Sequence, residues 1–173
     1  MTGRPVVLLG LMGAGKTSVG RRVAAALARP FWDSDEKLTA RYGATAAEQH
    51  RTVGEAVLHA REAALLREAV AARPAPVVAA AASVVEDPGT VAALAQAYVV
   101  WLNAPPEVLA SRVAASAADH RPRFRTDLVA QFQEQYDRRG ARLRQLADLV
   151  VDVSRRRPPQ VAATVLAAVR RTP

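Results

Sequence analysis

The chain has 173 residues, half of them apolar, which is enough to bury one sizeable core and too few for two ordinary domains. It contains no cysteine, which excludes both a disulfide framework and a thiolate metal site. The net charge of +8 comes from arginines that are scattered along predicted helices or gathered between residues 121 and 157. This pattern is typical of a solvated surface, so we expect neither nucleic acid nor a membrane as a partner.

The first predicted strand is the apolar run at residues 6–9, which a glycine-rich turn follows at once. Four apolar residues are too few for a signal-peptide core or a membrane span, so we expect a cytoplasmic protein. Helical spacing of apolar residues predicts a helix over residues 16–28, which Pro30 ends. A strand, a loop and a helix thus follow one another as in a βαβ unit.

Four more strands and four more helices are predicted towards the C-terminus, and helical pattern also separates the strands at residues 77–85 and 98–102. The strands are residues 31–32, 77–85, 98–102 and 149–153; the helices are residues 54–73, one carrying Leu109 and Val113, residues 127–146, and a closing one through Val165 and Val169. This alternation predicts an α/β fold with a parallel sheet covered by helices on both faces. Residues 116–125 lack apolar periodicity and are predicted to be an exposed, mobile loop.

The strongest motif is Gly-Leu-Met-Gly-Ala-Gly-Lys-Thr at residues 10–17, which matches G-x-x-x-x-G-K-[ST] between a predicted strand and a predicted helix. Glycines allow backbone N–H groups to approach phosphates, and the helix N-terminus adds a favourable dipole. A glycine-rich turn without a ligand is the alternative, but the adjoining Lys-Thr disfavours it. We therefore expect a site for ATP with Mg²⁺, formed by Gly10, Gly13, Ala14, Gly15, Lys16, Thr17 and Ser18.

Two carboxylates, Asp33 and Asp35, stand at the predicted end of a strand, where open α/β sheets gather ligand groups. Taken alone, Asp-x-Asp before a helix is as often an N-cap with a solvated neighbour. Beside a phosphate-binding loop, one carboxylate can hold the Mg²⁺ shell, and the other can accept a proton from an attacking hydroxyl. The pair therefore favours transfer of a phosphoryl group to an alcohol.

With these motifs, the chain resembles the shikimate kinases over nearly its whole length. The further residues that carry the resemblance are Gly54, Glu55, Glu62, Arg121, Pro122, Arg139 and the turn 156–158. It implies one P-loop kinase domain over residues 1–173, with a five-stranded parallel sheet and a mobile lid at about 116–125. It also implies ATP-dependent phosphorylation of a hydroxyl on a shikimate-like cyclic polyol, and we expect a monomer.

The resemblance assigns roles to individual residues. Lys16, Asp35 and Arg121 would be catalytic: Asp35 would bind and activate the acceptor hydroxyl, and Arg121 would neutralise charge on the transferred phosphoryl group. Asp33 would join Thr17 at Mg²⁺. Arg139 would bind the substrate carboxylate. The residues implied to contact the adenine are Arg112, Arg156 and Pro158.

The departures from the family pattern lie on the acceptor side. Residues 81–83 read Ala-Ala-Ser where family members usually carry three glycines, and His59 stands where an arginine is usual. We therefore expect His59 and Ala82 to contact the acceptor and shikimate itself to be a poor substrate. Glu62 lies three residues after His59 on an apolar face, which predicts a partly buried pair between the two side chains. His50 and His120 are interpreted as surface residues.

Two other functions fit parts of the sequence. A nucleotide-binding protein could keep the P-loop without efficient kinase activity, and a kinase could act on a different acceptor such as gluconate or an aminocyclitol. The presence of Asp35, Arg121 and Arg139 together favours the shikimate kinase-like enzyme.

Overall fold

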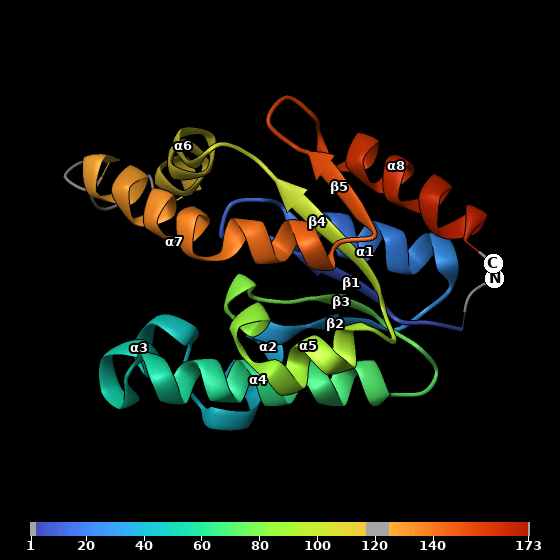
Figure 1. Ribbon diagram of the computed structural model, residues 1–173, viewed down its shortest axis with the longest axis horizontal. Helices are drawn as coiled ribbons and strands as arrows, with labels where there is room; N and C mark the ends of the chain where they lie inside the picture. Colours follow the sequence, from blue (N-terminus) through green and yellow to red (C-terminus); the bar gives the residue numbers. More distant parts are fainter. Residues whose placement is uncertain (1–2, 117–124, 173) are drawn as a thin grey trace.

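A single sheet of five parallel strands forms the centre of the molecule, with the strand order β2-β3-β1-β4-β5 (Figure 1). The structure, a computed structural model, describes residues 3–116 and 125–172, with only the backbone at residues 125–127. The strands are β1 (Val6–Leu9), β2 (Phe31–Asp33), β3 (Val77–Ala79), β4 (Tyr98–Asn103) and β5 (Leu149–Asp152). All four residues of β1 are buried, because β3 and β4 flank it and helices cover both faces.

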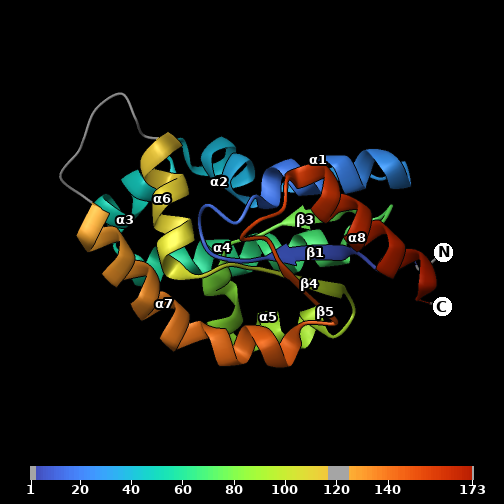
Figure 2. The ribbon, with the colours of Figure 1, turned by 90° about the horizontal axis from the view of Figure 1, so that it is seen from above.

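Helices follow the strands as the alternating pattern predicted. They are α1 (Lys16–Leu27), α2 (Ser34–Tyr42), α3 (Ala46–Val53), α4 (Glu55–Ala71), the 3-10 helix η1 (Ala82–Glu86), α5 (Pro88–Leu94), α6 (Pro106–Ser116), α7 (Arg125–Leu146) and α8 (Pro158–Arg171). Helices α1 and α8 pack together on one face of the sheet, with α5 and α7 on the other (Figure 2). The predicted α/β fold with a covered five-stranded parallel sheet is confirmed.

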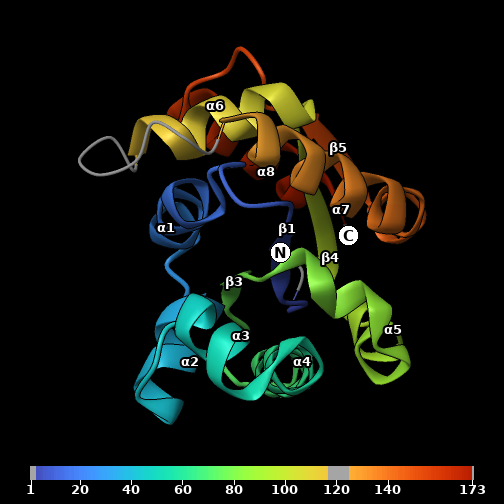
Figure 3. The same ribbon diagram turned by 90° about the vertical axis from the view of Figure 1, so that its left-hand side faces the viewer.

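The carboxyl ends of the strands face the side of the molecule where the expected site residues gather. Seen from that side, α2, α3 and α4 lie together on one side of the strand ends and α6 and α7 on the other (Figure 3). Among the described residues, no helix is long and apolar enough to cross a membrane.

The strand predicted over residues 77–85 is wrong beyond residue 79. Strand β3 ends at Ala79, and the chain turns into η1, whose Ser83, Val84 and Val85 are buried between α4 and α7. A short apolar run indicates burial but does not distinguish a strand from a helix. Because of this turn, Ser83 and Glu86 lie at the carboxyl ends of the strands.

Helices α2 and α3 were not predicted, although their ends carry recognisable signals. The Asp33 side chain caps the first turn of α2, and Gly43 ends that helix with a φ of 70°. A reciprocal capping box between Thr45 and Glu48 begins α3. The lid predicted at residues 116–125, including Arg121 and His120, lies almost entirely outside the described residues.

Candidate active site

The loop between β1 and α1 adopts backbone conformations that require glycine. Gly13 and Gly15 have φ values of 83° and 86°, in the left-handed region that other residues rarely adopt. A Cβ at Gly10 would lie 2.6 Å from the carbonyl oxygen of Leu102, so no side chain fits there. Ala14 is buried within the loop. No side chain caps the N-terminus of α1, which leaves its first N–H groups available to an anion.

Lys16 folds back over this loop. Its Nζ donates hydrogen bonds to the carbonyl oxygens of Gly10, at 2.8 Å, and Leu11, at 3.2 Å. Desolvation by the surrounding protein lowers the pKa of the Lys16 ammonium group, while the carboxylates of Asp35 and Asp33 oppose that shift. The ammonium group therefore lies among phosphate-loop carbonyls and near both acidic side chains.

Thr17 and Asp33 are joined directly. The Thr17 hydroxyl donates to Asp33 Oδ2 at 2.7 Å, and Asp33 Oδ1 accepts from the N–H of Asp35 at 3.0 Å, as expected of an N-cap. Two hard oxygens in this position fit Mg²⁺, which commonly takes one or two protein oxygens together with substrate phosphates. No group of three or more His, Cys, Asp or Glu side chains among the described residues could hold a metal by itself. Ser18 is exposed on the first turn of α1.

A cavity of about 310 Å³ opens beside the phosphate loop. Its walls come from the loop itself, the start of α2, the helices α3, α4 and α7, and η1. Among its lining residues are Lys16, Asp35, His59, Glu62, Ala82 and Arg139. The structure therefore brings together every residue that the sequence analysis assigned to the acceptor, although those residues are spread over more than 100 positions of the chain.

Asp35 opens onto this cavity at the first turn of α2. Partial desolvation raises the pKa of its carboxyl group above the ordinary value; the nearby Lys16 ammonium opposes this shift, and the charge of Asp33 adds to it. A carboxylate with a raised pKa is a stronger proton acceptor than an ordinary aspartate once it is ionised.

Glu62 and Ser83 form a buried pair on the cavity wall. The Ser83 hydroxyl donates to Glu62 Oε2, and both residues are at most 6% exposed. Burial raises the pKa of Glu62, while the bond from Ser83 opposes that shift. Ser83 thus supplies a hydrogen-bond partner for a largely buried carboxylate on the cavity wall.

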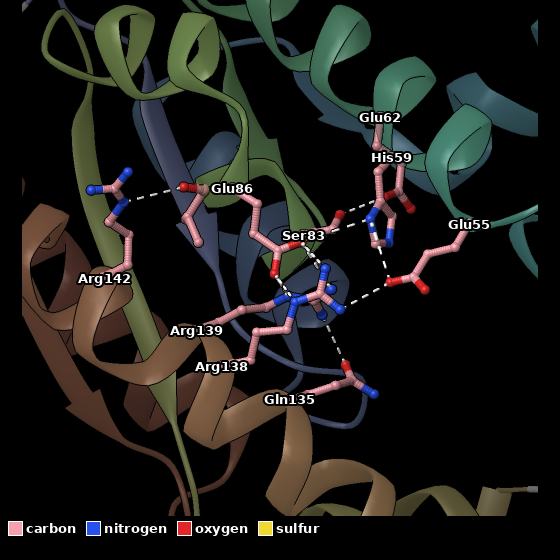
Figure 4. A network of polar contacts seen from close by, with 10 residues as sticks. Glu55, His59, Glu62, Ser83, Glu86, Gln135, Arg138, Arg139 and Arg142 are labelled. Carbon is pink, nitrogen blue, oxygen red and sulfur yellow. Dashed lines mark hydrogen bonds and ion pairs between the residues drawn. The ribbon is translucent and has the colours of Figure 1, made fainter.

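The predicted pair between His59 and Glu62 is wrong. His59 Nδ1 lies 3.7 Å from the carboxylates of Glu55 and Glu86, on the side of α4 that faces α7, whereas Glu62 turns towards Ser83 (Figure 4). Desolvation and the positive charge of Arg139 lower the pKa of His59. His59 is therefore mainly neutral at pH 7, and a role as a cationic substitute for the family's arginine does not fit.

Arg139 is 6% exposed and already has partners within the protein. Its Nε and Nη2 donate to the Glu86 carboxylate at 3.2 and 3.4 Å, and its Nη1 donates to Gln135 Oε1 at 3.1 Å (Figure 4). Arg138, the preceding residue, donates to Glu86 and to Glu55, each at 3.1 Å. A second cavity, of about 390 Å³, adjoins this network.

Glu86 was not predicted as a site residue, and no role was predicted for Glu55. Neither has a local signal: Glu86 ends a buried run, and its partners are contributed by α4 and α7. Arg138 was also missed, because neighbouring residues point about 100° apart on a helix and only one of them is expected to face a given site.

Arg112 joins the phosphate loop to the end of β5. It donates to the carbonyl oxygens of Gly13, at 3.3 Å, of Val153, and of Ser154, at 3.2 Å. Arg156 is exposed and donates to Thr164 Oγ1 at 3.4 Å, and Pro158 begins α8. These three predicted nucleotide contacts thus surround the turn between β5 and α8, next to the phosphate loop.

Sequence comparisons place this chain in a known family. The sequence model described as Shikimate kinase matches residues 12–170. The shikimate kinase of Chromohalobacter salexigens is 34% identical over 173 residues, which cover 99% of this chain and 95% of that protein. The shikimate kinase of Cupriavidus pinatubonensis is 36% identical over 168 residues, covering 95% and 86%.

Solved structures agree with this assignment. The shikimate kinase from Acinetobacter baumannii in complex with shikimate has a TM-score of 0.86 and 25% identity, covering 96% of this chain and 93% of that one. A gluconokinase from Sinorhizobium meliloti matches less well, with a TM-score of 0.63, and at 23% identity it shows the fold alone. The chain therefore belongs to the shikimate kinase family and is an ATP-dependent phosphotransferase that acts on an alcohol group.

Proposed function

We propose that this enzyme transfers the γ-phosphoryl group of ATP to a ring hydroxyl of shikimate or of a closely similar cyclic polyol. The observation that carries the proposal is that Lys16, Asp35 and Arg139 line one cavity of about 310 Å³ beside the phosphate loop. Kinship with the Acinetobacter baumannii enzyme, whose structure contains shikimate, supports this class of acceptor.

The phosphate loop and the first turn of α1 would hold the ATP phosphates through their N–H groups. Lys16 would exchange its bonds to the Gly10 and Leu11 carbonyls for contacts with the β- and γ-phosphates. Thr17 and Asp33 would hold Mg²⁺, which would neutralise phosphate charge when bound.

Asp35 would act on the acceptor. Its carboxylate accepts the hydroxyl proton while the acceptor oxygen forms a bond to the γ-phosphorus; the bond from that phosphorus to the bridging oxygen breaks, and ADP leaves. The raised pKa of Asp35 suits this task, because the driving force for proton transfer increases as the pKa of the base approaches the working pH.

The remaining roles follow from the family resemblance. Arg121 would neutralise charge on the phosphoryl group from the lid, and Arg112, Arg156 and Pro158 would contact the adenine. The grouping of the last three around one turn supports their shared role. His59, Ala82 and Arg139 would contact the acceptor from the cavity wall.

A screen of ADP release tests the proposal. With ATP and Mg²⁺ present, we expect release to depend on an added cyclic polyol from a panel of shikimate, quinate, gluconate, aminocyclitols and simple sugars. Thermal-shift measurements with ATP check the nucleotide site separately. Rapid turnover of gluconate or a simple sugar, without turnover of any cyclic polyol, would contradict the proposed acceptor class.

We further propose that residues 1–173 form a single kinase domain that works as a monomer in the cytoplasm. The match of the family model over residues 12–170 supports the single domain, and the lack of cysteine is compatible with a reducing compartment. Size-exclusion chromatography with light scattering tests the monomer, for which the expected mass is 18.5 kDa.

A further inference from the structure

The guanidinium group of Arg139 is occupied by the protein itself. Nε and Nη2 pair with the two oxygens of the Glu86 carboxylate, and Nη1 bonds to Gln135 (Figure 4). The Arg139 side chain is 7% exposed, so a ligand has little further access to it. Glu86 takes the Nε/Nη2 edge, one of the two edges through which an arginine can bind a carboxylate with two hydrogen bonds. An acceptor carboxylate would therefore have to displace Glu86 or bind the remaining N–H groups beside its negative charge.

Several contacts hold Glu86 in this position. Arg138 donates to it at 3.1 Å while also donating to Glu55, and His59 Nδ1 lies 3.7 Å away. Glu86 is the last residue of η1, whose preceding residues are buried between α4 and α7, so its backbone is fixed by packing. Displacing its carboxylate would break contacts with two guanidinium groups at once.

The charges within the network around Arg139 cancel. Two arginines, Arg138 and Arg139, face two carboxylates, Glu55 and Glu86, and His59 is mainly neutral at pH 7. Besides these two arginines, Lys16 is the remaining Lys or Arg among the described residues that line the two cavities, and it lies at the phosphate loop. The described wall therefore offers an acceptor carboxylate no guanidinium group without a carboxylate partner, and Glu86 would repel it. The Lys16 ammonium group bonds to loop carbonyls and is assigned to the ATP phosphates.

We infer that Glu86 determines acceptor specificity: by occupying Arg139 as an internal carboxylate, it disfavours acceptors with a carboxylate and favours cyclic polyols with an uncharged polar group at that position. This inference rests on the proposed function, because it concerns the acceptor of that same reaction. Glu86 acts through Arg139 and is a positioning residue rather than a catalytic one. An uncharged amide or hydroxyl could bond to the paired network without separating Arg139 from Glu86.

Shikimate and its carboxamide form a matched pair of probes, because they differ in charge but little in shape. Dissociation constants for both are measured by calorimetry with Mg²⁺ and a non-hydrolysable ATP analogue, and kcat and KM are measured with ATP. The variants are Glu86→Gln, which removes the charge, and Glu86→Asp, which keeps it. Glu68→Gln is the matched control, because Glu68 also pairs with an arginine, Arg41, but lies outside the two cavities described above.

We expect the unmodified enzyme to bind the carboxamide at least as tightly as shikimate. Glu86→Gln should shift the ratio of dissociation constants towards shikimate by about tenfold or more, the worth of a charge-assisted hydrogen-bond pair. The same shift should appear in KM rather than in kcat. In Glu86→Asp and Glu68→Gln the ratio of dissociation constants should stay within about twofold of that of the unmodified enzyme, far below the change expected from losing a charge-assisted hydrogen-bond pair.

An unchanged ratio in Glu86→Gln, or a clear preference of the unmodified enzyme for shikimate, would overturn the role of Glu86. Circular dichroism of each variant checks the fold, and the ratio compares two ligands on the same variant, so a partly unfolded sample does not alter it. If the ratios of dissociation constants are as expected but no acceptor is phosphorylated, the result would contradict the proposed function and leave the role of Glu86 intact. Failure of both probes to bind any variant would overturn both.

Discussion

The Thr17 hydroxyl donates a 2.7 Å hydrogen bond to Asp33, linking the phosphate loop to the end of β2. Because the other Asp33 oxygen caps α2, substitutions can separate the two roles of this carboxylate. Asp33→Asn keeps a good N-cap and removes the charge, so we expect kcat/KM to fall by about 10²-fold or more with little change in stability.

Asp33→Ala should show the same loss of activity and also lower the free energy of unfolding by about 1 kcal/mol, the usual worth of an N-cap. Urea denaturation and a titration of activity with Mg²⁺ measure the two effects separately. Equal stability of the Asn and Ala variants would contradict the cap, and an unaltered Mg²⁺ requirement would contradict the metal role.

Arg121→Ala should reduce kcat more than it raises the KM for ATP. An arginine that acts on the transferred phosphoryl group contributes most in the transition state, and such arginines change kcat by about 10³-fold or more in other phosphoryl-transfer enzymes. Steady-state kinetics at saturating acceptor, with Arg123→Ala as a neighbouring control, make the comparison. Normal kcat with a raised KM would assign Arg121 to ATP binding instead.

The pH dependence of kcat/KM should reveal Asp35. Burial raises the pKa of this carboxyl group above 3.8, and the base works only when ionised, so activity should be lost as pH falls through that raised pKa. The acid limb of the profile should therefore lie above pH 3.8. Asp33→Asn should move the limb to lower pH, because it removes a charge that raises the Asp35 pKa.

Circular dichroism at each pH excludes acid unfolding as the cause of the limb. A limb at an ordinary aspartate pKa, or one that Asp33→Asn moves to higher pH, would be incompatible with the environment found for Asp35.

The double variant His59→Arg, Ala82→Gly should improve shikimate as a substrate. It restores a guanidinium group and removes a methyl group from the cavity wall, and a charge-assisted pair of this kind is worth about 1.5–3 kcal/mol, or roughly 10- to 150-fold in KM. Part of the gain should be lost to Glu55 and Glu86, which lie 3.7 Å from His59 and would pair with the new side chain. Adding Glu86→Gln to the double variant should therefore improve the KM for shikimate by more than the sum of the free-energy changes from the double variant and from Glu86→Gln alone.

Kinetics of the single, double and triple variants with shikimate measure this coupling. Strict additivity would show that Glu86 and the side chain at position 59 act independently.

The sequence was most informative where function resides in contiguous residues. Residues 10–17 alone predict the phosphate loop, because its glycines, lysine and threonine carry the chemistry within one turn. The network around Arg139 could not be predicted in this way. Glu86 is 53 positions from Arg139, and its position depends on β3 ending early and on η1 packing between two helices.

His59 illustrates the same difficulty. Helical spacing suggested Glu62 as its partner, but packing of α4 against η1 directs the two side chains to different neighbours, Glu86 and Ser83. Spacing along one helix indicates which residues can share a face, whereas tertiary contacts decide which of them pair.

The most direct test of the account is acceptor-dependent ADP release by the unmodified enzyme and by Lys16→Ala, with ATP, Mg²⁺ and a saturating cyclic polyol. Lys16 contacts loop carbonyls and is not part of the hydrophobic core, so its removal should leave the circular dichroism spectrum unchanged. We expect the acceptor to stimulate ADP release by the unmodified enzyme, and the rate to fall by at least about 10²-fold in Lys16→Ala. The same rate of release with and without acceptor, or full activity in Lys16→Ala, would contradict the account.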